Sequence, residues 1–112
     1  MSRITSHVLD TSKGKPAPGI IVTLFMESEG RWVELGRDVT NEDGRVTSLA
    51  DPDVVLPRGN YKLHFDTGTY FEQKNIAPFF PSVEIIFHVN SGEHYHVPLL
   101  LSPFGYSTYR GS

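Results

Sequence analysis

Short segments in which apolar and polar residues alternate recur along the whole chain, and Gly, Pro, Asn and Asp separate them. An alternation with a period of two puts the apolar side chains on one face of a β-strand, which is typical of antiparallel sheets with one buried face. The pattern therefore predicts an all-β sandwich of two four-stranded sheets. The expected strands cover residues 6–9, 20–27, 32–39, 45–47, 61–66, 83–89, 95–101 and 106–109.

The segments between these strands are rich in residues that favour turns, most clearly at 13–19, 41–44 and 56–60. We interpret all three as loops. Only residues 69–75 look helical, because Thr69 can cap a helix, a glutamate follows three residues later, and a proline at 78 prevents continuation. We expect one short surface helix there.

The two faces of the segment 94–101, which contains an expected strand, are both largely apolar. One face suits the core and holds Tyr95, Val97, Leu99 and Leu101. The opposite face combines His94 and His96 with Pro98 and Leu100, which is too apolar for a strand face exposed to water. Because an exposed apolar strip on a small protein often marks a subunit interface, we expect an oligomer that buries imidazoles.

Composition restricts the remaining possibilities. A length of 112 residues fits one domain, 1–112. The net charge is −3 and the basic residues are scattered, so we expect no nucleic-acid partner. The absence of cysteine excludes disulfides, a thiol nucleophile and thiolate metal ligands. No apolar run is long enough for a signal peptide or a membrane span, so we expect a cytoplasmic protein with no membrane partner.

Three groups of residues carry a family resemblance. The first is His-Val-Leu-Asp at 7–10 with Gly-Lys-Pro-Ala at 14–17, the second is Thr-Asn-Glu-Asp-Gly-Arg at 40–45, and the third is the segment 94–112. Together they resemble the transthyretin-like family, and its enzyme branch, the 5-hydroxyisourate hydrolases, more than the hormone carrier. The resemblance spans nearly the whole chain. It implies a transthyretin-like sandwich with one short helix, assembled as a homotetramer (a dimer of dimers) with active sites in a central channel.

The resemblance also implies an activity and a set of site residues. The branch adds water to a ring carbonyl of 5-hydroxyisourate, which leads to 2-oxo-4-hydroxy-4-carboxy-5-ureidoimidazoline in urate degradation. It implies a small-molecule substrate, no cofactor and no metal. The matching catalytic positions are His7, Arg45 and His96, and the matching substrate-binding positions are Tyr109, Arg110, Gly111 and Ser112.

The chemistry of these residue types fits such a hydrolysis. A histidine is largely neutral near pH 7 and can accept a proton from water. The planar guanidinium of Arg45 suits the oxygens of a polar heterocycle. We expect Tyr109 to narrow the channel and Ser112 to bring a hydroxyl or α-carboxylate to the site. His94 faces the same way as His96, and we expect it to support the site or the interface.

Two alternatives stay open from the residues. The first is a carrier resembling transthyretin, with a small aromatic ligand in the channel. The second is a zinc hydrolase that uses His7, His94 and His96, because histidines at i and i+2 on a strand can share a metal. We expect structural roles for His88, Asp10 and Asp43, the two aspartates as turn or cap residues.

Overall fold

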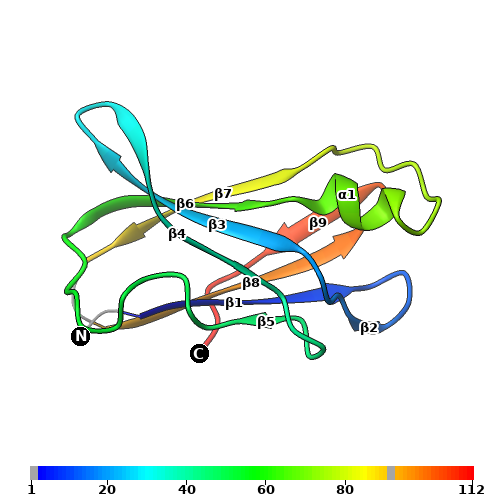
Figure 1. The fold of residues 1–112 in the computed structure, drawn as a ribbon, viewed down its shortest axis with the longest axis horizontal. Helices are drawn as coiled ribbons and strands as arrows, with labels where there is room; N and C mark the ends of the chain where they lie inside the picture. The colour runs from blue at the N-terminus through cyan, green and yellow to red at the C-terminus, as the bar shows by residue number, and fades with distance from the viewer. Residues whose placement is uncertain (1–2, 91–92) are drawn as a thin grey trace.

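The computed structural model describes residues 3–90 and 93–112, which form two β-sheets packed as two layers (Figure 1). The first sheet has the order β2-β1-β8-β9, and β5 also pairs with β1. The second sheet has the order β4-β3-β6-β7. The strands of the first sheet are β1 (Arg3–Asp10), β2 (Lys15–Pro16), β5 (Arg45–Val46), β8 (His94–Ser102) and β9 (Gly105–Thr108). Those of the second are β3 (Ile21–Ser28), β4 (Arg31–Val39), β6 (Gly59–Phe65) and β7 (Val83–Val89).

The expected two-sheet sandwich is confirmed, with two differences in the first sheet. It has five strands rather than four, because the short strands β2 and β5 both pair with the same edge of β1. In addition, β1 and β8 run parallel, whereas the sequence pattern suggested antiparallel strands. Alternation reports which face of a strand is buried, but it carries no information on the direction of a neighbour that is distant in the sequence.

The helix α1 (Thr67–Glu72) lies at one end of the sandwich (Figure 1) and begins earlier than the expected range of 69–75. The side chain of Asp66, not that of Thr69, provides the N-cap, because it accepts a hydrogen bond from the backbone N–H of Thr69. The expectation of one short helix is confirmed, and its expected boundaries and cap residue were wrong. Within residues 3–90 and 93–112, no helix is long and apolar enough to cross a membrane.

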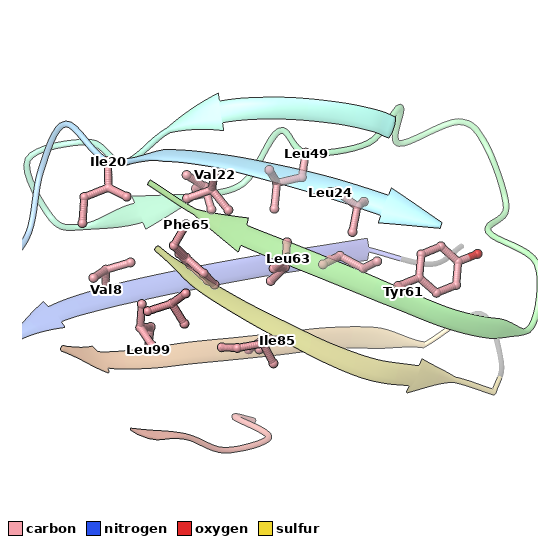
Figure 2. Packing of buried hydrophobic residues seen from close by; sticks show 14 of the residues in the cluster. Val8, Ile20, Val22, Leu24, Leu49, Tyr61, Leu63, Phe65, Ile85 and Leu99 are labelled. Carbon is pink, nitrogen blue, oxygen red and sulfur yellow. The ribbon is translucent and has the colours of Figure 1, made fainter. Parts of the chain in front are cut away.

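The core lies between the two sheets, where side chains from both interdigitate (Figure 2). Val8 and Leu99 contribute from the first sheet, and Leu24, Leu63 and Phe65 from the second, all fully buried. Burying side chains of this size stabilises a fold by roughly 1.5–3 kcal/mol each. The apolar face expected for residues 94–101 is also buried, so the alternating face that carries His94 and His96 points away from the core.

A buried carboxylate joins the helix to the first sheet. Asp10, at the end of β1, has no exposed surface and accepts hydrogen bonds from the Tyr70 hydroxyl (2.7 Å) and from the backbone N–H of Ser12 (3.0 Å). Burial alone would raise the pKa of Asp10, but the hydrogen bonds from Ser12 and Tyr70 outweigh it and lower the pKa. Asp10 is thus a turn residue, as expected, and also a tertiary link that the sequence did not reveal.

Candidate active site

Strand pairing brings the expected catalytic positions together on the outer face of the first sheet. In the antiparallel pair β1·β5, His7 lies opposite Arg45, and in the parallel pair β1·β8, Thr5 lies opposite His96. Residues 5 and 7 lie on the face of β1 opposite to the core residues Ile4 and Val8, because side chains alternate along a strand, although Thr5 is itself buried by its neighbours on that face. Three segments distant in the sequence therefore place polar side chains side by side.

The turn before β5 determines where Arg45 enters the sheet. The side-chain oxygen of Asn41 accepts hydrogen bonds from the backbone N–H groups of Asp43 (2.9 Å) and Arg45 (3.1 Å). Gly44 has a φ of +74°, and its carbonyl accepts a hydrogen bond from the N–H of Val8 at 2.8 Å. A Cβ atom at position 44 would collide with the carbonyl oxygen of Val8. Glycine at 44 thus lets the turn approach β1 closely.

A pocket of about 210 Å³ opens on this outer face. Arg3, Arg45, His94 and His96 contribute to its lining, and no Asp or Glu of the described residues does. The two arginines attract a ligand that carries negative charge or several carbonyl oxygens. The lining residues are Arg3, Thr5, Ser6, Arg45, Thr47, His94, His96 and Ser112.

His96 is half-buried at this pocket and is kept largely neutral. Burial lowers its pKa, and the nearby charges of Arg45, His94 and His7 lower it further. A neutral imidazole at neutral pH can accept a proton from a bound water molecule, which is the property that a general base requires. His7 is not among the residues that line the pocket, but its charge acts on His96.

The Thr5 hydroxyl connects the two histidines of β8. Its oxygen lies 2.8 Å from Nδ1 of His96 and 2.8 Å from Nε2 of His94. Sequence reasoning missed Thr5. Its position two residues before His7 puts it on the same strand face, but the pairing of β1 with β8 was needed to show what it contacts.

The last residues of the chain lie beside β8 (Figure 1). The N–H of Gly111 donates a hydrogen bond to the carbonyl of His96 at 2.8 Å. A Cβ atom at position 111 would lie 2.5 Å from Cδ2 of His96 and 3.2 Å from Cγ of Pro98. Glycine therefore allows the backbone to pass directly against the imidazole, and Ser112 follows at the edge of the pocket.

Tyr109 and Arg110 do not reach this pocket within one chain. They border a separate pocket of about 340 Å³ between β7 and the β8–β9 pair, with residues such as Ile86 and Tyr95. Arg110 forms an ion pair with Glu93 at 2.7 Å, and its guanidinium lies 4.7 Å from the centre of the Tyr95 ring. The substrate-binding roles expected for these two residues stay predictions.

The zinc alternative would need His7, His94 and His96 to converge on one point. Across the described residues, no group of three or more His, Asp or Glu side chains comes together in a way that could hold a metal ion. Nδ1 of His96 and Nε2 of His94 both face the Thr5 hydroxyl instead. Within the described residues of one chain, these two histidines therefore take part in a hydrogen-bond network and do not form a metal-binding cluster.

The two-sheet sandwich, with histidines and arginines gathered on one outer face, is the architecture of transthyretin-like proteins. The model of the HIUase/Transthyretin family matches residues 4–111, and the chain belongs to this family. It is 46% identical over 110 residues to a 5-hydroxyisourate hydrolase of Salmonella dublin. The matched region covers 97% of this chain and 80% of the relative.

Solved structures agree with this assignment. A 5-hydroxyisourate hydrolase from Klebsiella pneumoniae is 38% identical, with a TM-score of 0.87 and coverage of 100% of both chains. Sea bream transthyretin in complex with thyroxine is 30% identical, with a TM-score of 0.89 and coverage of 96% of this chain and 93% of that chain. The family resemblance read from the sequence motifs is confirmed.

Proposed function

We propose that this chain is a 5-hydroxyisourate hydrolase that opens the six-membered ring of its substrate by adding water to a ring carbonyl. The observation that carries the proposal is the half-buried His96, with its lowered pKa, beside Arg45 in a pocket that no described Asp or Glu lines. The relatives named as hydrolases support the same activity. The hydrolase domain would comprise residues 1–112.

The geometry suggests how the reaction proceeds. His96 takes a proton from water while the water oxygen bonds to the ring carbonyl carbon, and the carbonyl electron pair moves onto the oxygen. Arg45 stabilises this developing negative charge. When the tetrahedral intermediate collapses, the ring C–N bond breaks and the leaving nitrogen takes up the proton that His96 accepted from water. His7 lies opposite Arg45 in the β1·β5 pair, outside the pocket lining, and in this proposal it assists catalysis through its interaction with His96. Water and substrate suffice, with no cofactor or metal.

The terminal segment completes the site in this proposal. Gly111 sets the position of the His96 ring through close contact, and Ser112 offers a polar group at the pocket edge. Tyr109 and Arg110 would bind substrate only when assembly places them near the pocket of another subunit.

We propose a homotetramer, as the family resemblance implies. The support is a set of apolar side chains that a single chain leaves exposed, including Phe79 (71%), Ile86 (61%) and Phe104 (74%). A second subunit over the outer face of β8 would also enclose a pocket that is open in one chain. A cytoplasmic location stays a prediction, which microscopy of the protein in its own cells would test.

The test follows 5-hydroxyisourate generated in place from urate by uricase, with and without the purified protein. We expect faster loss of the intermediate, no effect on urate when uricase is absent, and loss of the acceleration in His96→Asn. Spontaneous decay provides the baseline. Decay that is unchanged at micromolar protein would overturn the proposal.

The same experiment separates the hydrolase from the carrier alternative. Both share the fold, because sea bream transthyretin and the Klebsiella hydrolase have similar TM-scores to this chain. The half-buried His96 beside the Arg45 guanidinium favours the hydrolase, since binding alone does not need a proton acceptor. A carrier would bind an aromatic ligand in titration calorimetry without accelerating decay of 5-hydroxyisourate.

A further inference from the structure

The Thr5 hydroxyl has an unusual set of neighbours. Thr5 is only 6% exposed, and its Oγ1 lies 2.8 Å from a ring nitrogen of each of two histidines. No other hydrogen-bond partner of this hydroxyl is found within the described part of the chain. Thr5 borders the open pocket, but because so little of its surface is exposed, the two histidines are its main hydrogen-bond partners.

Counting hydrogens limits the states of this group. A hydroxyl has one hydrogen to donate and lone pairs that accept, while a neutral imidazole has one N–H and one bare nitrogen. Nδ1 of His96 and Nε2 of His94 cannot both be bare, since a single hydroxyl hydrogen cannot serve two acceptors. At least one histidine must therefore donate to Thr5. If both donated, the hydroxyl hydrogen would have no partner among the described residues, so the satisfied arrangement has one histidine donating to Thr5 and Thr5 donating to the other. The two tautomers are therefore coupled through Oγ1.

The two possible directions differ at the reactive nitrogen. With Nδ1 of His96 held by Thr5, Nε2 is the ring nitrogen that remains for proton transfer. If Nδ1–H of His96 donates to Thr5, Nε2 is bare and can act as a base. In the opposite direction Nε2 carries the proton, and His96 cannot accept one from water. Only the first direction is compatible with base catalysis.

We propose that Thr5 is a positioning residue that holds His96 with its proton on Nδ1 while donating its own hydroxyl hydrogen to Nε2 of His94. The inference rests on the proposed function, because it assigns His96 the role of base. His94 then acts through Thr5, as the terminal acceptor of a hydrogen-bond chain that runs from His96. Thr5 thus accepts a hydrogen bond from Nδ1–H of His96 and fixes its tautomer, as an aspartate does for the histidine of a catalytic triad.

The first test compares Thr5→Val with Thr5→Ser. Valine keeps the shape and removes the hydroxyl, whereas serine keeps the hydroxyl and removes a methyl group. We expect Thr5→Val to lower kcat about 10- to 100-fold with little change in KM, since an orienting hydrogen bond acts on the chemical step. Thr5→Ser should recover most of this loss. A packing role predicts the reverse order, because serine leaves a cavity and valine does not.

The second test reads the tautomers directly and needs no substrate. Nitrogen-15 shifts of the His96 ring should indicate Nδ1–H at neutral pH in the native protein, and a mixture of tautomers in Thr5→Val. Thr23→Val is a matched control, because Thr23 is similarly buried (5%) on β3 of the other sheet. It should leave turnover and the His96 tautomer unchanged. Thermal melting of all variants checks that they are folded.

Three results would overturn the inference: an Nε2–H tautomer of His96 in the native protein, full kcat in folded Thr5→Val, or a lower kcat in Thr5→Ser than in Thr5→Val. A native protein without any turnover would instead overturn the proposed function, and the nitrogen-15 shifts alone would then decide whether Thr5 selects the tautomer.

Discussion

The N–H of Gly111 donates to the carbonyl of His96, and this contact leaves no room for a side chain between the two residues. A Cβ atom at 111 would lie 2.5 Å from the imidazole ring, closer than carbon atoms approach without displacement. The terminal segment and the proposed base therefore share one packing arrangement.

Gly111→Ala should consequently displace the His96 ring and lower kcat by about 10²-fold, the scale of a misplacement near 1 Å. Gly105→Ala in β9 is a suitable control, because its added Cβ would meet only Oγ of Ser102, at an ordinary contact distance of 3.8 Å. Turnover and melting of both variants provide the measurement. Native turnover in Gly111→Ala would show that displacement of the His96 imidazole does not slow the reaction.

The charge of Arg45 should be visible in the pH profile. Activity requires neutral His96, so it should fall as pH drops through the His96 pKa, which lies below its usual value of 6.5. Because Arg45 contributes to lowering that pKa, Arg45→Gln should move the acidic limb of kcat/KM to higher pH as well as reduce the rate. Arg37→Gln, on the other sheet, should leave the limb in place. An acidic limb that does not move in Arg45→Gln would contradict this electrostatic link.

Replacing His96 itself should have the larger effect on rate. His96→Asn should lower kcat about 10²- to 10⁴-fold, the usual range for the loss of a general base, while the core remains intact. His88→Asn serves as the control, since His88 is exposed on β7 and pairs with Asn60. Equal turnover in His96→Asn and native protein would place the base elsewhere.

The bond between Tyr70 and Asp10 should contribute to stability. Tyr70→Phe leaves a buried carboxylate with one donor fewer, so the free energy of unfolding should fall by about 1–3 kcal/mol in denaturant titrations. The pKa of Asp10 is lowered in the folded protein, so its ionised form stabilises the fold above the unfolded value of 3.8, and this stability is lost as pH falls through the folded pKa. The difference between the two proteins should therefore shrink in acid. A difference that grows in acid would contradict the role of the carboxylate.

Assembly can be tested at Leu100, which is half-buried on the outer face of β8 in one chain. Leu100→Asp would bury a charge in the proposed interface and should produce smaller, inactive species in light scattering. Leu35→Asp is the control, because Leu35 is 37% exposed on β4 of the other sheet. A fully active single chain would contradict the requirement for assembly.

The strand pattern was predictable because burial of one face imposes a two-residue period on the sequence itself. The alternation of Tyr61, Leu63 and Phe65 on β6 is observed, and Val83–Val89 has the expected bounds. The helix was placed two residues late, because Asp66 and Thr69 can both cap and only the folded backbone selects between them. Motifs around His7, Arg45 and His96 were sufficient to indicate the family.

The sequence by itself determined which residue types are available and which strand faces are apolar, since both depend on neighbours within a few positions. Only the tertiary structure decided which side chains meet. Thr5 is separated from its histidine partners by 89 and 91 positions, and the parallel register of β1 with β8 creates both contacts. The same holds for Gly111 against His96. Such pairings follow from the packing of the whole sandwich, because local propensity does not specify which distant strand becomes a neighbour.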